Sequence, residues 1–372
     1  MASLCTRCAL RLQRATEPTT RLRTFTTSPP RRRGGLPTFT PTSNPELDSL
    51  LSTLRTQHFI PAALTPPERK LILSPKSRQY LVENPQTTTI GNDEDVELKW
   101  IDQRTEIPNR VKLLKKAIRL MRESEEKAAW NQLPALLAGL KKMKKPAIDR
   151  QMAKTVRLAS NAGRFGIVLQ CLRQVHNTGM SLKKDEVLDA VIWGLRQIAA
   201  RDGWSKEGLE KALRDAKEVA MQLEDEEHGT GATVRPGDPR RRPEVVGVFL
   251  ELAAVWAYRF QDGKDADGKV RAYAERLLSN IEGAEGPTTT TPADKGPQHE
   301  MLRGVPIWHG LSLAQEMLDD DMPNAELASR VVGNWETGLR TLAQNLEADE
   351  TKMKPGSYGD QALTVWGDCV RD

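Results

Sequence analysis

Apolar residues recur every three or four positions through most of the chain between residues 108 and 346. The first such stretch is typical, because Val111, Leu114, Ile118 and Met121 would all lie on one face of a helix. Alternating runs of Val, Ile and Tyr bounded by turn residues, the pattern of a half-buried strand, are scarce. The pattern therefore predicts an all-α protein.

The same spacing predicts the individual helices. One helix covers residues 108–128, and a second opens near Asn131 and ends in a run of lysines at residues 141–145. Two more helices meet at Asn161-Ala162-Gly163. Further helices are predicted at residues 185–200, 205–223, 244–260, 269–281, 311–318 and 323–346.

The hairpin formed by residues 147–184 contains the most informative pattern. We expect its helices to pack through Ile148, Met152, Val156 and Ala159 on the first and Phe165, Val168, Leu169, Leu172 and Val175 on the second. Its turn, Ala162-Gly163-Arg164, is a small residue followed by a glycine and a basic residue, and Gly179 closes the second helix. These features resemble the pentatricopeptide repeat.

The resemblance covers about 80 residues, or some two repeats, and residues 201–204 stretch the second. It implies a fold of degenerate helical-hairpin (α-solenoid-like) repeats, which is common among proteins of organelle gene expression. The chain in this respect resembles accessory components of the mitochondrial ribosome. Base-reading proteins of this type use one repeat per base, so two or three repeats could read too few bases to select a transcript. We therefore assign no base-reading residues.

Residues 36–107 contain eight prolines, which predict that long helices are absent there. We predict an extended Pro-rich arm with short helices near residues 45–55 and 67–73. The arm is too apolar for a solvated linker, since it contains Leu50, Leu51, Leu54, Phe59 and Ile60. It would either fold along a partner or wrap over the protein's own helical core.

Composition shifts suggest the remaining boundaries. We expect a basic helical-repeat domain at residues 108–224, a linker at 225–243, an acidic helical domain at 244–350 with a disordered insert at 282–300, and a tail at 351–372. The longest apolar run, at residues 245–257, is interrupted by Glu251 and is shorter than the roughly 20 residues of a membrane span.

Charge is strongly polarised along the chain. The net charge is +7 in residues 1–35, −3 in 36–98, +14 in 99–184 and −13 in 185–372. A basic front and an acidic back favour two kinds of partner, one of which would be a polyanion. The first 35 residues hold eight arginines and the single acid Glu17, which is the composition of a mitochondrial transit peptide and predicts import into the matrix. The alternative is a disordered basic arm.

The +14 segment supplies the candidate site. Its cations would contact RNA phosphates, although a charge run is also the ordinary composition of a solvated helix face. The candidate phosphate-binding residues are Arg110, Lys112, Lys115, Lys116, Arg119, Arg122, Lys141, Lys142, Lys144 and Lys145.

No residue pattern predicts catalysis, a metal site or a cofactor. Cys5 and Cys8 form a CxxC without a second pair, and the five histidines are isolated from one another in the sequence. Gly229-Thr230-Gly231 lacks the Lys-Ser/Thr ending of a phosphate loop, and consecutive acids at residues 319–321 cannot all face one ion. We expect neither an enzyme nor a small-molecule substrate.

These observations favour a structural or accessory component of the mitochondrial ribosome or its assembly, with rRNA and ribosomal proteins as partners. One alternative is a pentatricopeptide-type factor for mitochondrial mRNA processing or translation. Another is an RNA-free scaffold for assembly of a respiratory complex. RNA crosslinking distinguishes the first two, and salt-independent RNA affinity would indicate the third.

Overall fold

The computed structural model describes residues 35–91, 94–124, 126–281, 286, 296–349 and 357–371. The predicted transit peptide, apart from residue 35, and most of the predicted insert at 282–300 lie outside these residues. In the part described the chain is mostly helical, as predicted, with a single two-stranded sheet.

The N-terminal half runs from a group of short helices into longer ones. A π-helical turn, Arg55–Phe59, joins the first two helices. The elements are α1 (Pro45–Leu54), α2 (Ile60–Ala63), α3 (Pro66–Leu73), α4 (Arg78–Glu83), β1 (Thr87–Ile90), β2 (Glu94–Glu97), α5 (Arg110–Glu123), α6 (Lys127–Trp130), α7 (Leu133–Lys142), α8 (Asp149–Asn161), α9 (Phe165–Arg173) and α10 (Val175–Thr178).

The C-terminal half consists of long helices. They are α11 (Asp185–Ala200), α12 (Lys206–Leu223), α13 (Pro243–Phe260), α14 (Lys269–Ile281), α15 (Pro297–Leu318), α16 (Ala325–Glu347) and α17 (Tyr358–Arg371). None of the described helices is long and apolar enough to cross a membrane.

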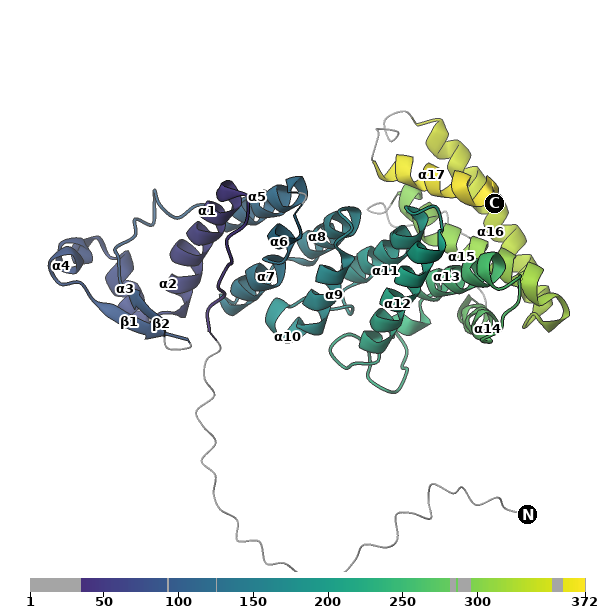
Figure 1. Ribbon diagram of the computed structural model, residues 1–372, viewed down its shortest axis with the longest axis horizontal. Coiled ribbons are helices and arrows are strands. Elements are labelled where there is room, and N and C mark those ends of the chain that lie inside the picture. The colour runs from purple at the N-terminus through teal and green to yellow at the C-terminus, as the bar shows by residue number, and fades with distance from the viewer. Residues whose placement is uncertain are drawn as a thin grey trace, which may run out of the picture.

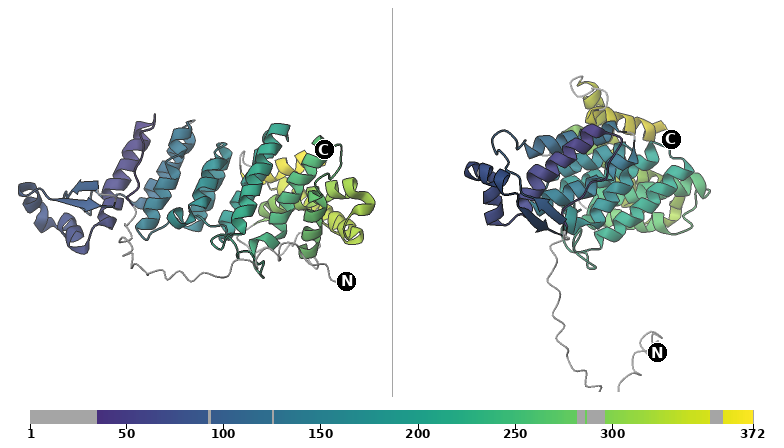
Figure 2. Two further views of the ribbon diagram at one scale, coloured as in Figure 1. Left: turned by 60° about the horizontal axis from the view of Figure 1, so that its bottom comes forward. Right: turned by 60° about the vertical axis from the view of Figure 1, so that its left-hand side comes forward.

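The molecule is elongated, and its helices stand side by side in a row (Figures 1 and 2). The short elements α3, α4, β1 and β2 form one end of the row, and α16 and α17 lie at the other (Figure 1). From α5 to α16 the helices follow one another along the row in chain order, whereas α1 lies beside α5 and α17 lies against α15 (Figure 1). Local hydrophobic periodicity favours such a row because each helix buries its apolar stripe against its neighbours.

The proline-rich segment contributes to the protein's own core. Leu47, Leu51 and Leu54 of α1 are buried in the same hydrophobic cluster as Leu114 and Met121 of α5. Side-chain capping by Asn44 and Pro45 at the first position explain why α1 begins where it does. This part of the segment thus wraps over the helical core, the second of the two predicted possibilities.

Residues 60–101 form a small separate core. Ile60, Ile72, Leu81 and Ile90 are among its buried residues, and β1 pairs with β2 in antiparallel register with Ile90 opposite Glu94. The strands escaped prediction because a four-residue Thr-rich run has too little apolar alternation to signal a sheet.

The central hairpin is built largely as predicted. Gly163 in its turn adopts φ +70° and Gly179 adopts φ +74°, conformations that glycine reaches without strain. The prediction for Ile148 was wrong, since this residue precedes α8 and is 62% exposed. It continues the helical period of Met152 and Val156, but it lies one position before the helix begins.

The segment predicted as a linker, residues 225–243, is held by buried polar contacts. The backbone N–H of Leu182 donates to Nδ1 of His228 at 3.2 Å, and Nε2 of the same ring lies 3.1 Å from the carbonyl oxygen of Leu172. The ring is therefore a neutral tautomer with its proton on Nε2, and burial lowers its pKa. Asp238 is also buried and pairs with Arg240 at 2.7 Å.

The helices at the C-terminal end differ from prediction in extent. α15 begins at Pro297, within the predicted insert, and contains Pro306, so the predicted start near residue 311 was too late. The predicted tail contains α17, whose Ala362, Val365 and Cys369 are buried in a second hydrophobic cluster. Helix α13 contributes to both large clusters, through Val248 and Leu252 to one and Leu250 and Ala254 to the other.

Candidate nucleic-acid interface

Five of the ten predicted cations form a stripe on the outer face of α5. The helix begins after Asn109, whose side chain accepts hydrogen bonds from the backbone N–H groups of Val111 and Lys112. At 100° per residue, the buried positions Leu114, Ile118 and Met121 fall on one face and the cations fall opposite. We call this group the α5 stripe; it comprises Lys112, Lys115, Lys116, Arg119 and Arg122, all of them exposed.

Members of the α5 stripe differ in their partners. Lys116 pairs with Glu46 of α1 at 2.6 Å, and Arg119 and Arg122 each approach Glu123 at 3.8 Å. Within the residues that the structure describes, Lys112 and Lys115 make no ion pair. Their charge is therefore available for an external anion without breaking an internal contact.

The lysines at the end of α7 are divided between internal and external roles. Nζ of Lys141 donates to the carbonyl oxygen of Val175 at 2.8 Å and so satisfies a backbone group at the start of α10. Lys142 donates to the carbonyl oxygen of Gly35, and burial lowers its pKa. Lys144, with φ +57°, and Lys145 follow the helix and are exposed.

A second basic group lies where α5 begins and α7 ends. Arg110 donates to the carbonyl oxygen of Lys145 at 3.2 Å and brings these two segments together. His58 lies nearby with Nε2 3.1 Å from the carbonyl oxygen of Pro108. Burial lowers the pKa of His58, and the positive charges of Arg110 and Lys145 lower it further. The histidine therefore remains neutral where the two cations meet.

Sequence reasoning missed a third basic group on α8. Arg150, Lys154 and Arg157 are spaced four and three residues apart, which places them on one face of the helix. The spacing is visible in the sequence, but these three cations are separated by other residues and form no run like the lysines at residues 141–145. None of the three makes an ion pair among the described residues, and Arg150 and Arg157 line a cavity that is described below.

Among the residues that the structure describes, the most buried ion pair joins Arg196 and Glu251. Nε of Arg196 lies 2.8 Å from Oε2 of Glu251, and the second guanidinium nitrogen lies 2.9 Å from Oε1. Both residues are essentially inaccessible to solvent. Nδ1 of His309 lies 2.8 Å from the same carboxylate, and Arg196 also donates to Sγ of Cys369 at 3.2 Å.

We call Arg196, Glu251, His309 and Cys369 the buried ionic cluster. Burial raises the pKa of Glu251, but the charges and hydrogen bonds of Arg196 and His309 together outweigh burial, and the net shift of the pKa is downward. Burial lowers the pKa of His309, but contacts with Cys369 and Glu251 outweigh it and raise the pKa to about 9. The cluster therefore holds an ionised carboxylate between two cations.

Glu251, His309 and Cys369 also have the atom types and proximity of metal ligands. The sequence showed five isolated histidines, but folding brings His309 to partners more than 50 residues away. The guanidinium of Arg196 contacts both the carboxylate and the sulfur, so a divalent cation there would face a fixed positive charge. The geometry fits an ionic network that joins α11, α13, α15 and α17 better than a metal site.

Comparisons with known proteins match most of the chain. The small ribosomal subunit protein mS27 of Neurospora crassa is 28% identical over 264 residues, which cover 69% of this chain and 65% of that protein. The match thus spans slightly less than two thirds of the relative's length. The family model described as mitochondrial ribosomal protein mS27 matches residues 23–368. Because that match includes nearly all of the helical row, from the proline-rich segment to α17, the chain belongs to the mitochondrial ribosomal protein mS27 family.

Proposed function

We propose that the chain is a non-enzymatic structural component of the small subunit of the mitochondrial ribosome, located in the mitochondrial matrix. Membership of the mS27 family carries the proposal. The name of the Neurospora crassa relative, a small ribosomal subunit protein, agrees with it.

The basic groups on α5, α7 and α8 would contact rRNA phosphates. Lys112 and Lys115, like Lys144 and Lys145, are well placed, because binding a phosphate would cost their side chains no internal partner among the described residues. Lys141 and Lys142 would contribute mainly by holding α7 against its neighbours. The exposed acids of the C-terminal half would face neighbouring ribosomal proteins, in keeping with the −13 charge of residues 185–372. The helical-hairpin repeats would supply the rigid row on which both faces are displayed.

Sedimentation of mitochondrial extracts tests the proposal. In a buffer that contains magnesium, the protein should sediment in the fractions that contain the small subunit. When the subunits are dissociated, the protein should move with the small subunit to its new position in the gradient. Absence from every ribosomal and pre-ribosomal fraction would refute it. RNA crosslinking of the same fractions should recover small-subunit rRNA, whereas recovery of one or a few messenger transcripts would favour an mRNA-binding factor.

A pair of matched variants locates the RNA contact. Lys112→Glu with Lys115→Glu reverses two charges of the α5 stripe, and Lys211→Glu with Lys217→Glu makes the same change on the exposed face of α12. Only the first pair should reduce incorporation into the subunit and raise the free protein fraction. Equal effects of both pairs would show that net charge, not the α5 stripe, is responsible.

A further inference from the structure

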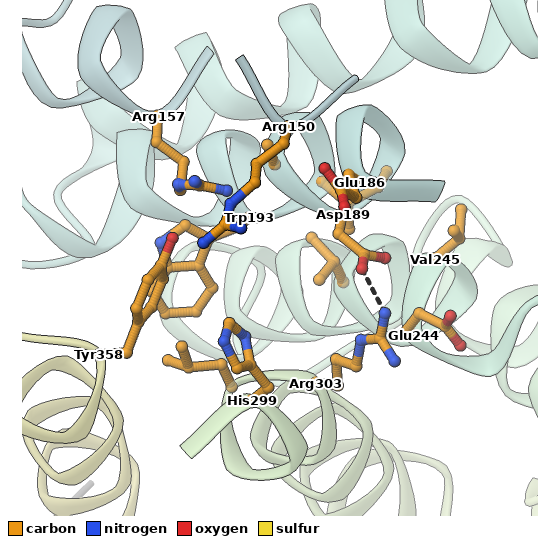
Figure 3. Close-up of a pocket in the computed structure, with 14 residues that line it drawn as sticks. Arg150, Arg157, Glu186, Asp189, Trp193, Glu244, Val245, His299, Arg303 and Tyr358 are labelled. Carbon is orange, nitrogen blue, oxygen red and sulfur yellow. Dashed lines mark hydrogen bonds and ion pairs between the residues drawn. The ribbon is translucent and has the colours of Figure 1, made fainter. Parts of the chain in front are cut away.

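A cavity of about 560 Å³ lies between α8, α11, α13, α15 and α17. Figure 3 shows Arg150 and Arg157 reaching into it from α8, toward the aromatic side chains of Trp193 and Tyr358. Glu186, Asp189 and Glu244 line another part of the cavity, with Glu186 and Asp189 drawn next to Arg150 in this view (Figure 3). Five helices distant in sequence thus place cations, aromatic rings and carboxylates around one space, whose size is within the range of roughly 300–1,000 Å³ typical of ligand sites.

The two arginines form an anion-binding pair. They are seven residues apart, so they lie on the same face of α8, and the guanidinium of Arg157 lies 5.5 Å from the centre of the Tyr358 ring. Within the described ranges neither guanidinium makes an ion pair. Burial raises the pKa of Tyr358 while the charges of Arg157 and Arg150 oppose that rise, which places both cations close to the phenol. The planar N–H donors of each guanidinium match the geometry of a phosphate.

The aromatic side chains form rigid platforms. Tyr358 packs against His299 with ring centroids 4.7 Å apart, and the guanidinium of Arg196 lies 5.8 Å from the Trp193 ring centre. Arg196 belongs to the buried ionic cluster, so Trp193 is positioned from the core. Planar rings held in this way beside arginines are the arrangement on which unpaired nucleic-acid bases stack.

The carboxylates of the cavity indicate that its ligand also carries hydrogen-bond donors. Asp189 pairs with Arg303 across the cavity, and neither Glu186 nor Glu244 makes an ion pair or hydrogen bond among the described residues. A second phosphate on that side would be repelled. The exocyclic amino groups of cytosine and adenine, by contrast, donate hydrogen bonds to carboxylates.

We propose that this cavity binds a single unpaired RNA nucleotide, with its phosphate on Arg150 and Arg157, its base against Trp193 and Tyr358, and a base amino group directed at Glu186 or Glu244. The RNA in the cell would be rRNA, and in that respect the inference rests on the proposed function. Lys154, on the same face of α8, extends the path for the adjoining phosphates.

Binding of short oligonucleotides by the purified full chain tests the proposal without the ribosome. Five-nucleotide RNAs of cytidine, adenosine or uridine, labelled for fluorescence anisotropy, should bind in a salt-dependent manner, and the uridine oligomer should bind most weakly because uracil has no amino group. Arg150→Ala with Arg157→Ala should weaken binding at least tenfold. Lys211→Ala with Lys217→Ala, the matched control, should leave it within twofold.

The aromatic contribution is tested separately. Tyr358→Leu should weaken binding about tenfold, because stacking on one aromatic ring contributes roughly 1–3 kcal/mol per base, or about 5- to 150-fold. Tyr358→Phe keeps the ring and should retain binding, which controls for any loosening of α17. Equal binding by all variants, or equal binding of the three homopolymers, would overturn the proposal.

Crosslinking in isolated small subunits separates this inference from the proposed function. Peptides containing Trp193 or Tyr358 should carry a crosslinked nucleotide. If the protein co-sediments with the subunit but those peptides crosslink to another protein, or to nothing, the nucleotide site is wrong and the ribosomal role stands. If the protein does not co-sediment yet binds the oligonucleotides through Arg150 and Arg157, the site stands and the ribosomal role is wrong.

Discussion

The buried ionic cluster allows a sharp test of what holds the C-terminal half together. Replacing Glu251 by Ala would leave the guanidinium of Arg196, 1% exposed, without its bidentate partner. Breaking a buried pair from one side costs about 3–5 kcal/mol, because the remaining charge is both desolvated and unpaired. Domains of ordinary stability unfold with a free energy of about 5–15 kcal/mol, so this single change would remove at least about a fifth of a typical total.

Removing both charges should cost far less. In the double variant Arg196→Met with Glu251→Leu, apolar side chains of similar length fill the same space, and replacements of this kind are often neutral or stabilising. The expected non-additivity between this double variant and its two component single variants, Arg196→Met and Glu251→Leu, is therefore about 3 kcal/mol. It would show that desolvated charge, and not lost volume, dominates the single substitution.

Equilibrium unfolding in guanidinium chloride at pH 7 measures these differences. Far-UV circular dichroism reports the helices, and tryptophan fluorescence reports the cluster because the guanidinium of Arg196 lies 5.2 Å from the Trp204 ring centre. The reasoning is refuted if Glu251→Ala costs less than 1 kcal/mol, or if the double variant is as unstable as the two single variants combined.

Three further predictions follow from described contacts. His309 has a folded pKa of about 9, above its unfolded value of about 6.5. Its protonation therefore stabilises the folded state fully below pH 6.5, and this stabilisation is lost as the pH rises to 9. Unfolding measured at a series of pH values should show a loss of about 3 kcal/mol in stability over this range, and the variant His309→Gln should lack that loss. Gly310→Ala should destabilise the protein by about 1–3 kcal/mol, because a Cβ there would lie 2.9 Å from the backbone nitrogen of Glu251. Gly333→Ala should stabilise it by about 0.5–1 kcal/mol, because a Cβ there would meet no described atom of another element within 4 Å. Thermal unfolding distinguishes the two variants. Lys112→Ala with Lys115→Ala should reduce the slope of log affinity against log salt by about 1.4–1.8 for a long rRNA fragment, and an unchanged slope would remove both residues from the interface.

Local periodicity predicted most of the fold because most of the helices bury a single stripe. The bounds of α11 and α14 agree with prediction for this reason. It failed at α15, which is buried against α13, α16 and α17 and is therefore apolar on several sides, so that its N-terminal turns near Pro297 showed no stripe. The proline-rich segment was ambiguous because the burial of Leu47 and Leu51 depends on α5, which begins some 60 residues later.

The candidate sites divide in the same way. The α5 stripe was found from the sequence because it belongs to one helix. The buried ionic cluster and the cavity each combine residues from four or five helices, so no local spacing reveals them. Glu251 was nevertheless a signal, since an acid in the middle of an apolar helix requires a buried partner of opposite charge.

Sharing α13 between the two large clusters has a consequence for synthesis of the protein. A nascent chain that ends at α12 lacks Val248 and Leu252 of α13. Apolar side chains of the first cluster that pack against α13 would therefore be exposed to solvent at this stage. Once α13 emerges, its other face, with Leu250 and Ala254, packs against α14 and is completed only when α15 arrives. The first cluster is therefore complete only after α13 has been synthesised, and the second only after α15 and the helices that follow it.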